Sequence, residues 1–261
     1  MSDAAIAEAT LSTDIWHGAL QRFRDNVTRT QASILHPQPI SNEELWAFYN
    51  SMGWRFTDTQ IQVLDDPTRF MVLEIGRRWG KTEVALRKAI ATMACRPGSN
   101  VAYIPRHRRV LERNWPRFTR EIEHAEAMGK LKVMRRSDGE KEVRLANFST
   151  LSAGSFDHAT TWVGSGYDLV IADEAALFDP STWSEVIDPA ISDRRGAVML
   201  ISTPFGESWI TELPADEIRQ LRREARLMHI HDPAELDAYV HPRRLWRSYA
   251  FASWTNTFAF P

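Results

Sequence analysis

The chain has 261 residues, of which 43% are hydrophobic and 25% are charged. This balance is typical of a folded globular protein and excludes a mainly disordered chain. The formal net charge is −2, so the chain as a whole has no excess of positive charge that would indicate a nucleic-acid partner. Its length allows one large domain or two small ones.

The amino-terminal sequence has neither a basic segment nor an apolar core, and no stretch approaches the roughly 18 apolar residues of a membrane span. We therefore expect neither a signal peptide nor a transmembrane helix. Cys95 is the only cysteine, which excludes an intrachain disulfide and fits a reducing cytosol. Only five of the 32 basic residues are lysines. The arginine excess has two explanations, a polyanionic partner or a compositional bias of the genome, and composition alone does not separate them.

The first clear element is a helix over about residues 42–52, because Ser41 and Glu44 form a capping box and apolar residues follow at helical spacing. From residue 70 onward, short apolar runs alternate with amphipathic stretches. The apolar runs predict strands over residues 70–75, 101–104, 169–172 and 198–202. The remaining pattern predicts helices over about 81–94, after Pro105 (kinked or restarted at Pro116) and from Asp179-Pro180, with a hairpin formed by 131–134 and 143–145.

Near-continuous apolar strands separated by helices predict an α/β fold, with a mostly parallel sheet covered by helices on both faces. The weakly patterned start of the chain predicts an amino-terminal helical arm, and residues beyond 206 predict a mainly helical tail. We accordingly divide the chain into an arm and helix (1–53), a core (54–210) and a helical tail or linker (211–261).

A candidate phosphate-binding loop, Gly76-Arg77-Arg78-Trp79-Gly80-Lys81-Thr82, follows the first predicted strand and begins the next helix. Such a loop presents backbone N–H groups to phosphate, and the positive end of the helix points to the same place. Lys81 is expected to neutralise the β- and γ-phosphates of a nucleotide, and the Thr82 hydroxyl to bind Mg²⁺. The glycines are one residue closer together than in the usual P-loop, and the alternative is an ordinary glycine-containing turn.

A pair of carboxylates, Asp173 and Glu174, follows the apolar run 169–172. Ligands of open parallel sheets bind at the carboxyl ends of the strands, so these groups are expected near the phosphate loop. Asp173 is expected to hold Mg²⁺, and Glu174 to orient and activate the water that attacks the γ-phosphate. By itself this pattern is equally consistent with an acidic turn after a strand. Paired with the phosphate loop, it predicts a hydrolytic nucleotide site.

Hydroxyl groups also follow the last apolar run, at Ser202-Thr203-Pro204. In this position they are candidates for sensing the γ-phosphate and coupling its loss to the next segment. The alternative is an ordinary turn at the end of a strand.

Together these motifs resemble the ATPase domain of the large terminase subunit of tailed bacteriophages, a P-loop NTPase of the RecA/ASCE-like type and the motor that packages DNA into capsids. The family pattern G-R-x-x-G-K-[ST] matches residues 76–82, including the short spacing. The pattern D-E-A-A matches residues 173–176, and S-T-P-x-G matches residues 202–206. The resemblance covers about residues 54–210.

The resemblance implies ATP hydrolysis that drives double-stranded viral DNA into a procapsid, with ATP and Mg²⁺ as cofactors. It assigns an adenine contact to Gln60 and a possible role in catalysis to Arg77. It implies as partners the portal protein of the procapsid, the small terminase subunit and further copies of the chain in a ring, typically of five subunits. The implied location is the cytoplasm of the infected host, outside the finished virion.

Two departures from the family pattern affect these expectations. Many members have an arginine finger shortly before the acidic strand, where this chain has Val163, and Arg194 and Arg195 are the replacement candidates. A full large terminase also continues into a nuclease domain. Because this chain ends at Pro261, we expect an isolated motor domain without nuclease activity.

Candidate DNA contacts are arginines, because sequence-independent tracking of a duplex requires phosphate contacts rather than base contacts. Arg135 and Arg136 on the predicted hairpin are the favoured pair. Two further groups are residues 106–109 and 219–226, and a solvated helix face explains the second equally well. Two other functions stay open: a helicase-like ATPase, and an assembly protein that nucleotide binding regulates without much hydrolysis.

Overall fold

The structure is a computed structural model that describes residues 40–156, 162, 165–204, 206 and 208–259. The expected amino-terminal arm before residue 40 and the finger position Val163 lie outside these residues. Within them, no helix is long and apolar enough to cross a membrane.

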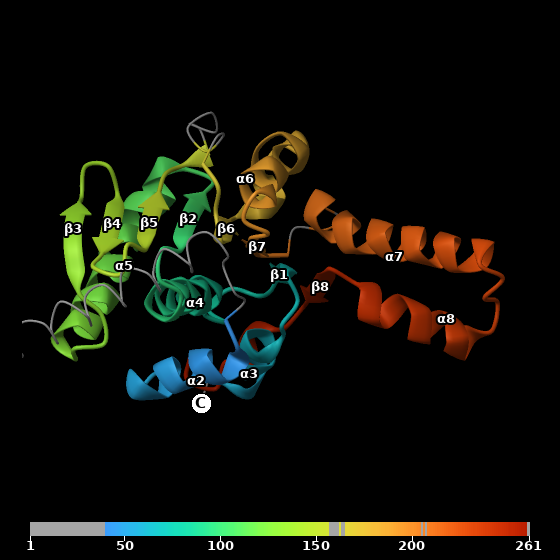
Figure 1. The fold of residues 1–261 in the computed structure, drawn as a ribbon, viewed down its shortest axis with the longest axis horizontal. Helices are drawn as coiled ribbons and strands as arrows, with labels where there is room; N and C mark the ends of the chain where they lie inside the picture. Colours follow the sequence, from blue (N-terminus) through green and yellow to red (C-terminus); the bar gives the residue numbers. More distant parts are fainter. Residues whose placement is uncertain (1–39, 157–161, 163–164, 205, 207, 260–261) are drawn as a thin grey trace, which may run out of the picture.

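A single sheet of eight strands forms the centre of the described structure, in the order β3-β4-β5-β2-β6-β7-β1-β8 (Figure 1). All neighbouring strands are parallel except for the two pairs that contain β4. The strands are β1 (Phe70–Glu74), β2 (Asn100–Pro105), β3 (Val133–Ser137), β4 (Glu142–Leu145), β5 (Thr150–Ala153), β6 (Leu169–Asp173), β7 (Ala197–Ser202) and β8 (Trp246–Tyr249). The mostly parallel sheet and the β3–β4 hairpin confirm the expectation from sequence.

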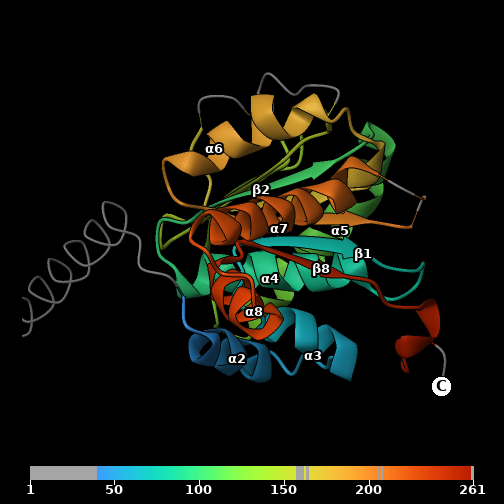
Figure 2. The same cartoon turned by 90° about the vertical axis from the view of Figure 1, so that its right-hand side faces the viewer.

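Helices cover both faces of this sheet, as the apolar strands require. One face packs against α2 (Asn42–Ser51), α3 (Asp58–Asp65), α4 (Lys81–Cys95) and α5 (Arg108–Ala127). The other packs against η2 (Ala175–Leu177), η3 (Trp183–Ile187), α6 (Asp188–Ser192) and the start of α7 (Trp209–Leu227). Figure 2 shows α2, α3 and α4 on one side of β1 and β8, with α6 on the other side. The α/β class with helices on both faces is confirmed.

Side chains on alternate positions of each strand divide between the two cores. In β1, for example, Met71 and Leu73 face the core with α4, whereas Phe70 and Val72 face the core with α6. This is the period of two expected of a strand that is buried on both faces. It explains why these strands are apolar at every position.

Two expectations about individual elements are wrong. The helix α5 runs through Pro116 without the predicted kink or restart, because the side chains on either side of it, Trp115 and Phe118, are buried in the core. The carboxyl-terminal tail is also not only helical. It contains α7, α8 (Pro233–Val240), η4 (His241–Arg243) and η5 (Ser253–Thr255), but β8 between them joins the sheet beside β1.

Candidate functional site

The phosphate loop connects β1 to α4 and adopts the strained backbone that such loops need. Arg78 and Gly80 have positive φ angles, 64° and 97°, and Gly80 is the N-cap of α4. A side chain at Gly80 would place its Cβ 2.9 Å from Nε2 of Gln60, so both backbone angle and space favour glycine there. Arg77 and Arg78 have exposed side chains, whereas Trp79 is completely buried. The loop therefore has one buried anchor and two arginines that face solvent.

The amine of Lys81 lies inside this loop. It donates hydrogen bonds to the carbonyl oxygens of Ile75, at 2.5 Å, and of Gly76, at 3.1 Å. Partial burial lowers the pKa of Lys81; Asp173 opposes this effect and Arg77 adds to it. Lys81 is thus held at the centre of the loop by groups that an incoming phosphate can replace.

The carboxylate of Asp173 lies next to Thr82, 91 positions away in the sequence, as the motifs predict. Thr82 Oγ1 donates to Asp173 Oδ2 at 3.1 Å. The same oxygen accepts a hydrogen bond from the Tyr103 hydroxyl at 2.7 Å, and Asn114 Nδ2 donates to that hydroxyl at 2.6 Å. Burial raises the pKa of Asp173, while the hydrogen bonds from Tyr103 and Thr82 lower it. Tyr103 and Asn114 hold Asp173 in place, and neither was predicted from the sequence.

The donors at this point fit Mg²⁺. The ion usually binds one or two protein oxygens and completes its shell with water and substrate phosphates. Thr82 and Asp173 supply one hydroxyl and one carboxylate within hydrogen-bond distance of each other. The described residues contain no group of three or more His, Cys, Asp or Glu placed to hold a metal without such help. This donor set suits a metal that arrives with a phosphate.

Glu174 follows Asp173 in a left-handed backbone conformation, with φ 61° and ψ 35°. This conformation is unfavourable for a residue with a side chain, and such strain often occurs at functional sites. The side chain is half-buried, and its carboxylate has no hydrogen-bond partner in the described part of the chain. Glu174 is therefore free to bind a water molecule.

The strand β7 lies between β6 and β1, so Ser202 ends between the acidic pair and the phosphate loop. The Ser202 carbonyl accepts a hydrogen bond from the Ile75 N–H at 3.1 Å. Ser202 is buried, and Thr203 and Pro204 become progressively more exposed. The three residues lead directly from the loop toward α7.

Gln60 is buried beside the phosphate loop, and both ends of its amide are already used. Its Oε1 accepts from the Thr57 N–H at 3.1 Å, and its Nε2 donates to the Trp79 carbonyl at 2.8 Å. These contacts make Gln60 a brace for the loop. The predicted adenine contact requires at least one of these bonds to be exchanged.

A carboxyl-terminal strap, residues 251–256, packs against the phosphate loop. The Gly76 N–H donates to the Phe251 carbonyl at 3.0 Å, and the rings of Phe251 and Trp79 stack with centroids 5.8 Å apart. Asn256 Nδ2 donates to the carbonyls of Arg78, at 2.8 Å, and Trp79, at 3.1 Å. No motif in the strap indicated this role.

We predict that Asn256→Ala weakens nucleotide binding about tenfold, because two loop carbonyls lose their donor and the strained loop loses support. The measurement is the dissociation constant for ADP. Asn50→Ala, at an exposed position on α2, is the matched control and is expected to have no effect. Unchanged ADP affinity in a correctly folded Asn256→Ala protein would show that the strap does not shape the loop.

The arginines predicted to contact DNA or a neighbouring site are less conclusive. Arg135 and Arg136 lie on the β3–β4 hairpin, but they pair with Glu140 and with Asp138 and Glu123, respectively. Arg194 and Arg195 precede β7 at the opposite edge of the sheet from the phosphate loop. Within one chain, they do not reach the nucleotide site.

The comparisons agree with this geometry. The large terminase subunits of Thermus phage G20c and Thermus virus P23-45 are 29% and 30% identical over 182 residues, which are 63% of this chain. The chain spans 37% of the length of these curated relatives.

Solved structures share the fold. The large terminase ATPase domain of Thermus phage P74-26 aligns with a TM-score of 0.62 and 24% identity over 82% of this chain and 87% of that one. The large terminase of a thermophilic bacteriophage, solved in complex with ADP, aligns with a TM-score of 0.52 and 15% identity, over 78% and 47%. Residues 72–252 match the family described as "Terminase large subunit, T4likevirus-type, N-terminal", and the chain therefore belongs to this family of terminase large subunits.

Proposed function

We propose that this chain binds ATP with Mg²⁺ and hydrolyses it. The observation that supports this best is the meeting of Lys81, Thr82 and Asp173 at one edge of the sheet, with Glu174 directly beside them. A phosphate loop alone is consistent with many nucleotide-binding proteins. A free carboxylate next to the metal-binding aspartate favours hydrolysis, because attack by water needs a group that orients it and accepts its proton.

In this proposal each residue has one task. The backbone N–H groups of residues 76–82 and the Lys81 amine bind the β- and γ-phosphates. Thr82 and Asp173 hold Mg²⁺, which neutralises charge on the phosphates. Glu174 orients the attacking water and accepts its proton. Gln60 lies on the nucleotide side of the loop, and the exposed Arg77 is placed to contact phosphate in its own subunit.

We further propose that hydrolysis moves double-stranded DNA into a procapsid. Family membership supports this role. Changes at Ser202-Thr203-Pro204 would reach α7 directly, because this segment connects the nucleotide site to that helix. Arg135 and Arg136 on the exposed hairpin remain the favoured phosphate contacts to DNA. The proposed partners are the portal protein of the procapsid, the small terminase subunit and further copies in a ring, in the cytoplasm of the infected host.

The test is a phosphate-release assay on the purified chain, with ATP and Mg²⁺ and with no DNA, duplex DNA or single-stranded DNA. We expect hydrolysis that stops when Mg²⁺ is chelated and that duplex DNA increases. A greater increase with single-stranded DNA would favour the helicase-like alternative. ATP binding without hydrolysis under any of these conditions would favour an assembly protein regulated by nucleotide.

A further inference from the structure

A second cavity, of about 790 Å³, lies at the opposite edge of the sheet from the phosphate loop. Its lining includes residues that directly precede β1, β6 and β7, together with residues of α4 and the start of α2. The volume is within the range of about 300–1,000 Å³ that small-molecule sites occupy. None of the motifs in the sequence points to this place.

The lining of the cavity has more positive than negative charge. Its basic residues are Arg69, Lys88, Arg96, Arg194 and Arg195, and its acidic residues are Asp66, Asp168 and Asp193. Asp66 is already paired with Arg247, at 3.1 Å, and accepts a hydrogen bond from Tyr249. Because neither partner lines the cavity, Asp66 contributes little toward neutralising the five cations there.

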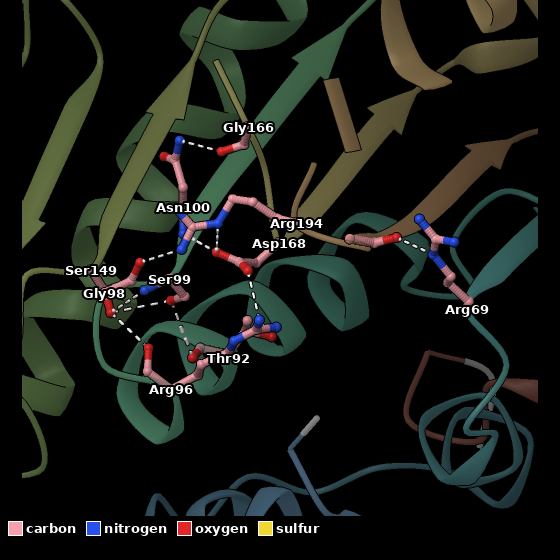
Figure 3. A network of polar contacts seen from close by, with 11 residues as sticks. Arg69, Thr92, Arg96, Gly98, Ser99, Asn100, Ser149, Gly166, Asp168 and Arg194 are labelled. Carbon is pink, nitrogen blue, oxygen red and sulfur yellow. Dashed lines mark hydrogen bonds and ion pairs between the residues drawn. The ribbon is translucent and has the colours of Figure 1, made fainter. Parts of the chain in front are cut away.

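One pair of arginines has a carboxylate between them. Asp168 is buried and forms ion pairs with Arg96 at 2.9 Å and with Arg194 at 3.0 Å. It also accepts a hydrogen bond from the Asn100 N–H at 2.7 Å. Figure 3 shows Asp168 between the two guanidinium groups, with Arg69 at a distance from them. In this part of the cavity, the protein supplies the anion that two neighbouring cations require.

The remaining cations have no such anion. Arg69 Nε donates to the Gly196 carbonyl at 2.6 Å, a neutral acceptor. The side chains of Lys88 and Arg195 have no hydrogen-bond or ion-pair partner in the described part of the chain. Burial lowers the pKa of Lys88 to about 8, although Asp66 opposes this. A cation that is partly buried without a partner gains free energy when an anion binds beside it.

We propose that this cavity binds the phosphate group of an organic phosphate through Arg69, Lys88 and Arg195. Phosphate fits this set because it has more than one negative charge and matches the planar fork of a guanidinium group. The apolar side chains of Ile40, Leu45 and Leu169, which also line the cavity, would contact the organic part. The phosphate belongs either to a free nucleotide or to the DNA backbone. The proposal does not depend on ATP hydrolysis at the phosphate loop.

The test measures binding of three probes: pyrophosphate, thymidine 5′-monophosphate and a short DNA duplex. The full chain carries Lys81→Met, which blocks the phosphate loop, and the salt concentration is about 150 mM so that weak surface contacts are screened. Lys88→Met and Arg195→Ala are then added separately. Lys88→Met keeps the aliphatic stem, and the Arg195 side chain is exposed, so both proteins are expected to fold. Arg55→Ala, at an exposed arginine that does not line the cavity, is the matched control.

We expect each cavity substitution to weaken binding of at least one probe tenfold or more, and Arg55→Ala to have no effect. Loss of monophosphate and pyrophosphate binding would identify a free nucleotide as the source. Loss of duplex binding alone would identify the DNA backbone. If the affinities for all three probes are the same with and without the cavity substitutions, the proposal is wrong.

Discussion

Replacing Glu174 with glutamine is expected to lower the rate of ATP hydrolysis about 10³-fold and to leave ATP affinity within about twofold. The glutamine side chain has nearly the same shape, but it cannot accept the proton of the attacking water. Because the Glu174 carboxylate has no hydrogen-bond partner in the described structure, the substitution removes no contact that supports the fold. Phosphate release under single-turnover conditions measures the chemical step directly.

The matched control for this variant is Glu235→Gln, at an exposed glutamate on α8. It is expected to hydrolyse ATP at the rate of the unchanged chain. If Glu174→Gln retains a tenth or more of that rate, another group must activate the water. If instead it loses ATP affinity, Glu174 contributes to binding rather than to proton transfer.

The parts of the site that the sequence predicts are those in which the chemistry lies within one short segment. Lys81 and Thr82 follow directly from their place between a strand and a helix. Asp173 follows from the end of an apolar strand, because the carboxyl ends of parallel strands share one edge of the sheet. For these residues, local pattern and general topology are sufficient. The hydrogen bond between Thr82 and Asp173 confirms the inference.

The supporting residues could not be predicted in this way. Tyr103 and Asn114 contact Asp173 from β2 and α5, and Asn256 contacts the loop from 177 positions away. In the sequence, Tyr103 is one more apolar residue of a strand, and Asn256 lies in an irregular segment. Their roles depend on how separate elements pack, which periodicity does not specify.

The strand β8 shows a related limit. Trp246 and Tyr249 are buried and bracket a short segment, but four residues at the end of a chain are a weak signal next to two long helices. The strand forms because β1 would otherwise be the edge of the sheet with unpaired backbone groups. The need for this pairing becomes visible only when the order of the strands is known.

Replacing Lys81 with methionine is expected to weaken ATP binding about 10²-fold and to reduce hydrolysis below detection. Each charge-assisted hydrogen bond to phosphate contributes about 1.5–3 kcal/mol, so the loss of one or two such bonds accounts for a change of this size. Methionine keeps the aliphatic stem in the loop, so the variant tests the amine rather than the packing. Calorimetric titration with ATP in the presence of Mg²⁺ measures the affinity.

The structure also predicts that this variant remains folded. Burial already lowers the pKa of Lys81, so removing the charge removes an unfavourable desolvation along with the bonds to Ile75 and Gly76. The midpoint of thermal unfolding is therefore expected to change by only a few degrees in the absence of nucleotide. Lys130→Met, at an exposed lysine after α5, is the matched control for both measurements. A variant that binds ATP as tightly as the unchanged chain would mean that the loop recognises phosphate through its backbone alone, and Lys81 would lose its assigned role.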